Sequence, residues 1–224
     1  MATCLSQQIQ REYALFRAAP HALLQAVLFF IMLMVFFPMT LPYSPSLYRE
    51  VLPGILGVSL SFAIFLNTSH FFLIDLECAY LFQLKILKKS FIEYVYAKML
   101  VNGGVILVAL LMVSPLIAVL YQLNVTEYLA LNLAIITTLP GVLLLCSLMA
   151  SISAFKQRQA ILLLIVLFPL ILPWLIIGSL GLTAALTASL YLPYFARAFA
   201  LSLLAITILP FIISAILQAG IEQA

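Results

Sequence analysis

Acidic and basic side chains gather in one short stretch of the chain. The stretch DLECAYLFQLKILKKSFIEYVYAK, residues 75–98, holds seven of the seventeen acidic and basic residues of the sequence. They are Asp75, Glu77, Lys85, Lys88, Lys89, Glu93 and Lys98. Acids mixed with bases and aromatic residues are typical of a protein contact, because a surface that binds anionic lipids would favour bases alone. We predict that this stretch docks a protein partner; plain membrane anchoring with snorkelling lysines is the alternative.

Few other residues could do chemistry. His21 and His70 are the only histidines; either could ligate a haem iron, but neither has a recognisable partner, and an ordinary interfacial position is the better interpretation. The three cysteines, Cys4, Cys78 and Cys146, are isolated and form neither a disulfide framework nor a metal motif. The sequence has no G-x-x-x-x-G-K-[ST], H-E-x-x-H or G-x-S-x-G motif. We therefore expect no enzyme activity, and any energy for transport would come from a partner.

The composition decides the class of protein. The chain has 224 residues, of which 66% are hydrophobic and 8% charged, and its mean hydropathy is +1.26. A soluble domain is about half apolar and a quarter charged, and no soluble fold of this size could cover so much apolar surface. We therefore predict an all-α integral membrane protein. The net charge of +3 is too small to suggest nucleic-acid binding.

Six segments are long enough to cross a bilayer, which takes about 20 apolar residues. They cover about 22–42, 51–74, 99–121, 128–153, 160–179 and 198–218. We expect one transmembrane domain over residues 1–224. The predicted span interiors hold no Asp, Glu, Lys or Arg, which disfavours an ion-driven transporter. Their strongest polar residues, Asn67, Asn102 and Asn132, are expected to form hydrogen bonds between helices.

The placement of lysine and arginine predicts the orientation. With a cytoplasmic N-terminus, eight basic residues lie inside and two outside. The inner set is Arg11, Arg17, Lys85, Lys88, Lys89, Lys98, Lys156 and Arg158, and the outer set is Arg49 and Arg197. Both termini would then be cytoplasmic, and the outer connections would be about 43–50, 122–127 and 180–197.

Two amphipathic elements are predicted on the inner side. An interfacial helix over about residues 4–19 has an apolar stripe that contains Tyr13 and polar residues elsewhere; Glu12 lies at the edge of the stripe. Its defining residues are Leu5, Ile9, Arg11, Tyr13, Phe16 and Arg17. The basic residues would meet anionic lipid headgroups.

The second amphipathic element is a short helix over about residues 76–88. Apolar residues fall on one of its faces at helical spacing. They are Leu76, Tyr80, Leu84, Leu87 and Phe91. Ser90 and Glu93 match the S-x-x-E capping box, so we expect a break near Lys89–Ser90 and a new helix that continues into the third span.

Six spans, an interfacial N-terminal helix and a cytoplasmic coupling helix between spans two and three resemble the permease subunit of an ABC-2-type transporter. Particular runs narrow this resemblance to the haem exporter protein B family, the membrane subunit of the system I cytochrome c maturation complex. They are LPGILGVSLSF (52–62), DLECAYLFQL (75–84), YAKML (96–100), VSPLIAVL (113–120) and LFPLILPWLIIGS (167–179). The match covers about residues 10–220.

The chain departs from the family pattern in its coupling segment, residues 75–98. The family usually has Asp-Gly where this chain has Cys78-Ala79, and Glu where it has Phe82. Gly57 stands where a tryptophan is common. The segment keeps Asp75, Glu77, Leu81, Gln83 and Leu84.

The resemblance implies a set of partners in the bacterial inner membrane. These are a cytosolic ABC ATPase subunit, a second copy of the permease, a tryptophan-rich haem-handling membrane subunit, a small single-span subunit and a periplasmic haem chaperone. The ATPase would dock on the coupling segment through Asp75, Glu77, Tyr80, Leu81, Gln83, Leu84, Lys85 and Lys88. Haem would be a transported or handled ligand, and no bound cofactor is assigned to this chain. A generic ABC-2 permease for a lipid, glycan or drug, and a non-transporting membrane scaffold, are the alternatives.

Overall fold

The computed structural model describes residues 2–18, 20–42, 44–69, 71–87, 90–155 and 160–223, which form α-helices without any strand. A helix α1 (Ala2–Ala18) precedes the first long apolar helix, α2 (His21–Thr40). The others are α3 (Pro45–Thr68), α4 (Phe71–Glu77), α5 (Tyr80–Ile86), α6 (Phe91–Leu120), α7 (Val125–Phe155), α8 (Ala160–Leu186) and α9 (Leu192–Gln223). The predicted all-α class is confirmed.

Six helical segments of the described chain are long and apolar enough to cross a membrane, as the sequence predicts. They are His21–Thr40, Ser46–Glu77, Phe91–Leu120, Val125–Phe155, Pro169–Leu186 and Leu192–Glu222. The connections expected at 43–50, 122–127 and 180–197 are shorter than predicted, because the helices continue past charged and polar residues that were taken as span limits. Arg49 lies inside α3 and Glu127 inside α7.

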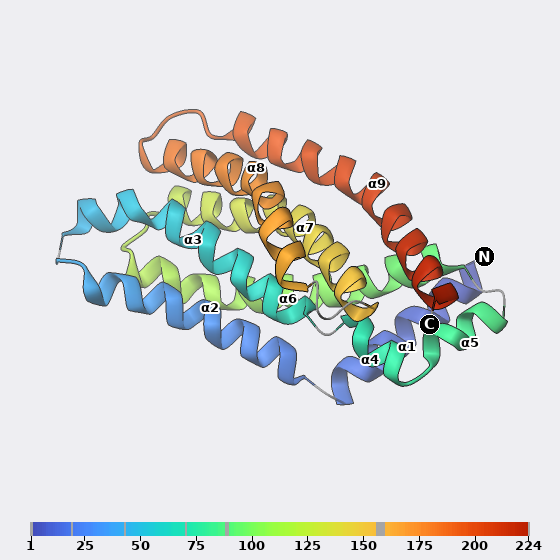
Figure 1. Cartoon of the computed structure of the whole chain (residues 1–224). Coiled ribbons are helices and arrows are strands. Elements are labelled where there is room, and N and C mark those ends of the chain that lie inside the picture. Colours follow the sequence, from blue (N-terminus) through green and yellow to red (C-terminus); the bar gives the residue numbers. More distant parts are fainter. Residues whose placement is uncertain are drawn as a thin grey trace.

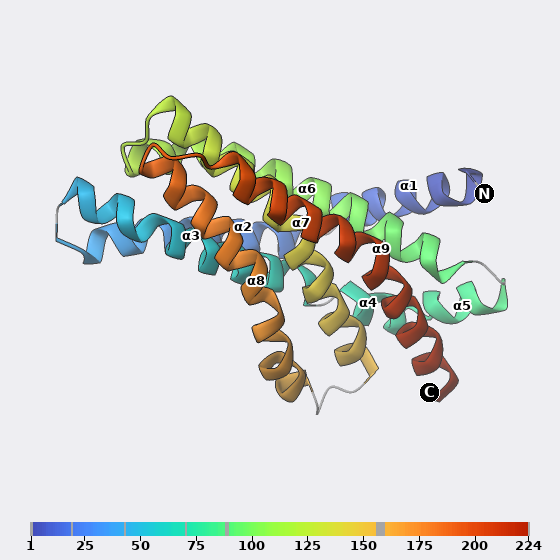
Figure 2. The same cartoon turned by 90° about the horizontal axis from the view of Figure 1, so that it is seen from above.

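The helical bundle has two structurally different ends. Both termini lie at the same end as α4 and α5, whereas the α2–α3, α6–α7 and α8–α9 connections lie at the opposite end (Figures 1 and 2). Helix α7 packs against α3, α4, α6, α8 and α9 and is the most enclosed span. The bundle therefore forms around α7, while α2 keeps most of its surface exposed.

An ion pair fastens the end that carries the connections. Arg49 on α3 lies 3.4 Å from the buried Glu127 carboxylate on α7 and donates to the carbonyl of Gln122 at 3.0 Å. The second Glu127 oxygen accepts from the backbone N–H of Asn124, the residue before α7, at 2.8 Å. Glu127 therefore caps its own helix while it holds α3.

A proline inside a span has no backbone N–H to donate to the carbonyl one turn earlier. At three prolines, a side-chain hydroxyl group donates to that carbonyl instead. Pro38 cannot donate to the carbonyl of Met34, one turn earlier, and the hydroxyl of Tyr121 donates to this carbonyl at 3.1 Å. The same holds one turn before Pro115 and Pro210, where the carbonyls of Leu111 and Ile206 accept from Ser114 at 2.8 Å and Tyr96 at 2.9 Å. These bonds allow proline in a span without an unsatisfied carbonyl.

The only tryptophan of the sequence joins three spans. Trp174 on α8 donates from Nε1 to the Ser202 hydroxyl on α9 at 3.0 Å, and Ser202 donates to the carbonyl of Thr137 on α7 at 2.7 Å. The indole lies against Gly141 of α7, where a Cβ atom would meet Nε1 at 1.9 Å. Gly141 therefore permits a close approach of α8, as expected for glycine between membrane helices.

Candidate functional site

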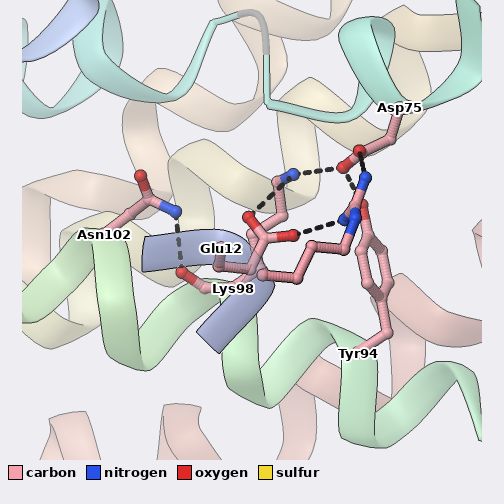
Figure 3. Close-up of polar contacts among 6 residues, drawn as sticks. Glu12, Asp75, Tyr94, Lys98 and Asn102 are labelled. Carbon is pink, nitrogen blue, oxygen red and sulfur yellow. Dashed lines mark hydrogen bonds and ion pairs between the residues drawn. The ribbon is translucent and has the colours of Figure 1, made fainter. Parts of the chain in front are cut away.

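Four charged side chains from three helices meet at the end of the bundle that carries both termini (Figure 3). Arg11 and Glu12 come from α1, Asp75 from α4 and Lys98 from α6. Lys98 pairs with the Asp75 carboxylate and lies 3.4 Å from Glu12 Oε2. Arg11 lies 2.8 Å from Glu12 Oε1 and 2.7 Å from Asp75 Oδ1. We call Arg11, Glu12, Asp75 and Lys98 the charge cluster.

The charge cluster is buried and electrically balanced. Glu12, Asp75 and Lys98 are 4%, 1% and 5% exposed, and Arg11 is partly exposed. Two cations face two carboxylates, so every buried charge has a counter-charge. Removal of one member of such a cluster typically costs about 3–5 kcal/mol, because the remaining charge stays buried without compensation.

Asp75 is the centre of the charge cluster. Its Oδ2 accepts hydrogen bonds from the hydroxyl of Tyr94, at 2.5 Å, and from the ammonium of Lys98. Tyr94 and Lys98 lie four residues apart on α6, which places both side chains on one face of the helix. Together with Arg11, they give the Asp75 carboxylate three donors from two helices.

The charge cluster corrects one sequence expectation. The span interiors were predicted to lack acidic and basic residues, but Asp75 and Lys98 are buried in helical segments that continue the second and third spans. The prediction ended each span at its first charged residue, so these residues fell outside the spans. The only signal in the sequence was Glu12, which interrupts the apolar stripe of the N-terminal helix.

Helix α1 packs against α6 through a polar face. Gln8 and Glu12, four residues apart, are both 4% exposed, whereas Tyr13 is 53% exposed. The predicted apolar stripe therefore remains at least partly uncovered and available to lipid, and Glu12 lies at its edge because it faces α6. Ile9, Arg11 and Phe16 are partly exposed and Arg17 is exposed, while the side chain of Leu5 lies outside the described residues.

Burial and the neighbouring charges shift the acidity of the α1 side chains. Burial raises the pKa of the Glu12 carboxyl above its usual value of 4.5; the nearby Lys98 and Arg11 act against this rise, and Asp75 adds to it. Burial by itself would lower the pKa of Arg11, but the hydrogen bond and the charge of Asp75 raise it overall. Burial therefore disfavours the charged form of Glu12, whereas Asp75 favours the charged form of Arg11.

Arg11 also connects the charge cluster to α5. Its guanidinium carbon lies 3.3 Å from the centre of the Tyr80 ring, a cation–π contact. Tyr80 is the first residue of α5 and follows Ala79, whose φ of 56° is left-handed. Ala79 thus occupies a glycine-like backbone conformation at the position where the family resemblance expects glycine.

The coupling segment, residues 75–98, is divided differently from the prediction. The helix expected over 76–88 is interrupted at Cys78–Ala79, so its residues belong to α4 and α5. Its apolar stripe is interrupted too, because the exposed Leu87 follows the end of α5 and Phe91 begins α6. Ser90 caps α6 as predicted: its hydroxyl accepts from the N–H of Glu93 at 3.4 Å, and α6 begins at Phe91.

The residues proposed for docking separate into two groups. Asp75, Leu81 and Leu84 are buried and hold α4 and α5 on the bundle, and Tyr80 is half-buried. Glu77, Gln83 and Lys85 are exposed. Lys88 lies outside the described residues. The apolar Ile86 and Leu87, which the sequence prediction did not include, are 78% and 63% exposed at the end of α5.

A pocket of about 150 Å³ lies beside the charge cluster. Its lining comes from α1, α2, α3, α4 and α6 and includes Glu12, Asp75, Lys98, Asn67 and Asn102. Asn67 is 4% exposed, and its Nδ2 has no hydrogen-bond partner among the described residues.

The span asparagines do not form the predicted bonds between helices. Asn102 and Asn132 donate from Nδ2 to carbonyls of their own helices, at 3.0 and 3.1 Å, one turn back. Each side chain thus bonds to its own helix instead of to a neighbouring one. Such a local bond competes with bonds between helices because a carbonyl four residues earlier is always within reach.

No group of three or more His, Cys, Asp or Glu side chains suited to a metal ion occurs in the described part of the chain. His21 is exposed at the start of α2, and His70 lies outside the described residues. Cys146 is buried and Cys78 is exposed, and both are free thiols. The polar chemistry of the described side chains is thus concentrated in the charge cluster.

A comparison with models of protein families shows to which family the chain belongs. A family model described as CcmB protein matches residues 3–220. The chain belongs to the CcmB protein family. The charge cluster, the pocket and the whole coupling segment all lie within the residues that match this family.

Two relatives match the chain along 96% or more of its length. One is Heme exporter protein B of Pseudomonas aeruginosa, 27% identical over 223 residues, which cover 100% of both chains. The other is Heme exporter protein B of Haemophilus influenzae, 25% identical over 218 residues, which cover 96% of this chain and 97% of the relative.

Proposed function

We propose that the chain is the membrane permease subunit of a haem-export complex that serves cytochrome c maturation. Its membership of the CcmB protein family and its similarity to two proteins named Heme exporter protein B support this function. The six candidate spans agree with a multi-pass permease formed as one transmembrane domain over residues 1–224. The sequence has no phosphate-binding motif, so a separate cytosolic ATPase subunit would supply the energy.

The ATPase subunit would dock on the exposed face of α5. Ile86 and Leu87 are large apolar side chains that project at one end of the bundle. Charged and polar residues are exposed in the same segment: Glu77 at the end of α4, and Gln83 and Lys85 in α5. An apolar centre with a polar rim is the usual anatomy of a protein interface. This exposed surface is the observation that carries the docking proposal.

The orientation follows from charge and from the position of α5. The basic residues near the N-terminus and in the coupling segment favour a cytoplasmic location for that end. The termini share the end of the bundle with α5 (Figure 1), so a cytosolic ATPase would find the docking surface on the same side. We therefore propose a bacterial inner membrane protein with both termini in the cytoplasm.

Further subunits belong to the same proposal. They are a second copy of the permease, a tryptophan-rich haem-handling membrane subunit, a small single-span subunit and a periplasmic haem chaperone. Haem would be the handled or transported ligand. Motion driven by ATP would pass through the permease to the haem-loaded chaperone.

Deletion of the gene tests the role in cytochrome c maturation, and a point variant tests the docking site of the ATPase subunit. Deletion of the gene should abolish c-type cytochromes and leave b-type haem proteins intact. Normal c-type cytochromes in a deletion strain without a second copy would refute haem export and favour a permease for a lipid, glycan or drug. Failure to recover any ATPase subunit with the mildly solubilised wild type would favour a membrane scaffold.

The docking surface is tested by Ile86→Glu. This variant should reduce co-purification of the ATPase subunit at least tenfold without preventing membrane insertion. The matched control is Leu190→Glu, since Leu190 is 82% exposed at the opposite end of the bundle. Equal co-purification with both variants would remove α5 as the docking site.

A further inference from the structure

The charge cluster joins three helices beside the proposed docking site and reaches a fourth, α5. Arg11 and Glu12 belong to α1, Asp75 to α4 and Lys98 to α6, and Arg11 reaches the first residue of α5 through the Tyr80 ring. Helix α5 has no buried charge of its own in the described chain. The cation–π contact of Arg11 with the Tyr80 ring connects α5 to α1.

We propose that the charge cluster makes α1, α4, α5 and residues 91–102 of α6 one rigid unit, which passes movement of the docking helix to the interfacial helix and to the third span. We call it the coupling unit. In this role Arg11, Glu12, Asp75 and Lys98 are positioning residues, and the inference rests on the proposed function. No member of the charge cluster can leave the others without exposing a desolvated charge, so these helices move together.

The borders of the coupling unit are structurally weak. A turn at Pro20 separates α1 from α2, and α3 ends at Thr68, before α4 begins at Phe71. In α6, Gly103 and Gly104 follow directly after residue 102. A short helical break and two adjacent glycines are positions where a chain can absorb a change of direction.

The pocket beside the charge cluster lies on this border. Glu12, Asp75 and Lys98 line it from the coupling unit, and Leu23 of α2 and Asn67 of α3 line it from the rest of the bundle. A pocket of about 150 Å³ therefore lies where residues of the two parts meet. The amide of Asn67, without a partner among the described residues, is a free donor on the bundle side.

The coupling unit has further contacts with the rest of the bundle. Helix α4 packs on α7, Tyr96 of α6 donates to the carbonyl of Ile206 on α9 at 2.9 Å, and α5 contacts α9 through Lys85 and Glu222, whose charged atoms lie 3.5 Å apart. Both of these side chains are well exposed, and an exposed ion pair contributes little to stability. The contact of α5 with Arg11, through the Tyr80 ring, lies within the coupling unit.

Distance measurements test rigidity directly. In a chain with Cys4, Cys78 and Cys146 replaced by serine, spin labels at Tyr13→Cys and Gln83→Cys report a distance within the coupling unit. Labels at Gln83→Cys and Leu190→Cys report its distance from the opposite end. The labelled permease is diluted with unlabelled permease and assembled with its ATPase subunit. When ATP is added, the second distance should change and the first should not.

Two outcomes of this measurement would overturn the inference. The first is a Tyr13–Gln83 distance that changes as much as the Gln83–Leu190 distance. The second is that neither distance changes, because then no movement passes through the coupling unit.

A charge-balanced variant tests the role in function. Glu12→Gln with Lys98→Met leaves one cation and one carboxylate in the charge cluster and removes the direct link between α1 and α6. We expect normal co-purification of the ATPase subunit, a broadened Tyr13–Gln83 distance and at least a tenfold loss of c-type cytochromes. The matched control is Glu127→Gln with Arg49→Met at the opposite end, which should stay within threefold of wild type.

The outcomes separate the inference from the proposed function. If wild type binds the ATPase subunit and supports c-type cytochromes but the charge-balanced variant does so equally well, the coupling unit is refuted and the proposed function stands. If wild type neither binds the ATPase subunit nor supports c-type cytochromes, the proposed function is refuted, whatever the charge-balanced variant does.

Discussion

Lys98 and Asp75 form an ion pair from which solvent is almost completely excluded, although they lie 23 residues apart and on different helices. The pair fixes the start of the third span against the end of the second. Because Glu12 of α1 also contacts Lys98, the same ammonium group determines where the N-terminal helix lies.

The first prediction concerns the stability that this ammonium group provides. Lys98→Met leaves two buried carboxylates with Arg11 as their only close cation, so we expect a loss of about 3–5 kcal/mol in the free energy of unfolding. The measurement is thermal unfolding in detergent. Lys85→Met is the matched control: its pair with Glu222 is exposed, so the loss should be about 0–1 kcal/mol. Similar losses in both variants would contradict the buried pair.

The second prediction concerns the coupling between Glu12 and Lys98. Glu12→Gln added to Lys98→Met removes the one carboxylate that is then in excess, so the double variant should be more stable than Lys98→Met by about 1–2 kcal/mol. The same unfolding measurement gives this difference. If Glu12→Gln instead destabilises the Lys98→Met background as much as it destabilises wild type, the two side chains act independently.

The third prediction concerns pH. Since burial raises the pKa of Glu12 above 4.5, the folded chain binds this proton more tightly than the unfolded chain. The resulting stability is fully present below pH 4.5 and is lost as the pH rises through the folded pKa. The melting temperature of wild type minus that of Glu12→Gln should therefore fall as the pH is raised from 4.5. A difference that rises with pH would mean that the ion pair with Lys98 outweighs burial.

The sequence predicted the spans well and the charge cluster poorly. Span position depends on apolar composition along the chain, which is a local property, and all six segments are found. The charge cluster depends on contacts between α1, α4 and α6, and no local pattern indicates which charged residues pair. A docking role was likewise predicted for residues 75–98 from their composition, but only the fold separates the buried Asp75 from the exposed Lys85.

The fourth prediction concerns the turn between α4 and α5. Ala79 has a φ of 56°, a region that costs an L-residue roughly 1 kcal/mol and glycine nothing. Ala79→Gly removes this strain but increases the freedom of the unfolded chain, so we expect a gain in stability of about 0.5 kcal/mol. Ala200→Gly, at an exposed position inside α9, should instead lose about 1 kcal/mol. A loss at both positions would argue against the left-handed turn.

The fifth prediction concerns the contact between α7 and α8. A Cβ atom at Gly141 would lie 1.9 Å from Nε1 of Trp174, so Gly141→Ala must displace the indole and break its hydrogen bond to Ser202. We expect a loss of about 1–3 kcal/mol in the free energy of unfolding. Because Trp174 is the only tryptophan, its fluorescence reports the displacement directly, as a shift of the emission maximum. Gly104→Ala is the matched control: a Cβ atom there meets nothing within 4 Å, and the variant should keep wild-type emission and gain helix stability. Unchanged emission in Gly141→Ala would mean that the indole does not lie on this glycine.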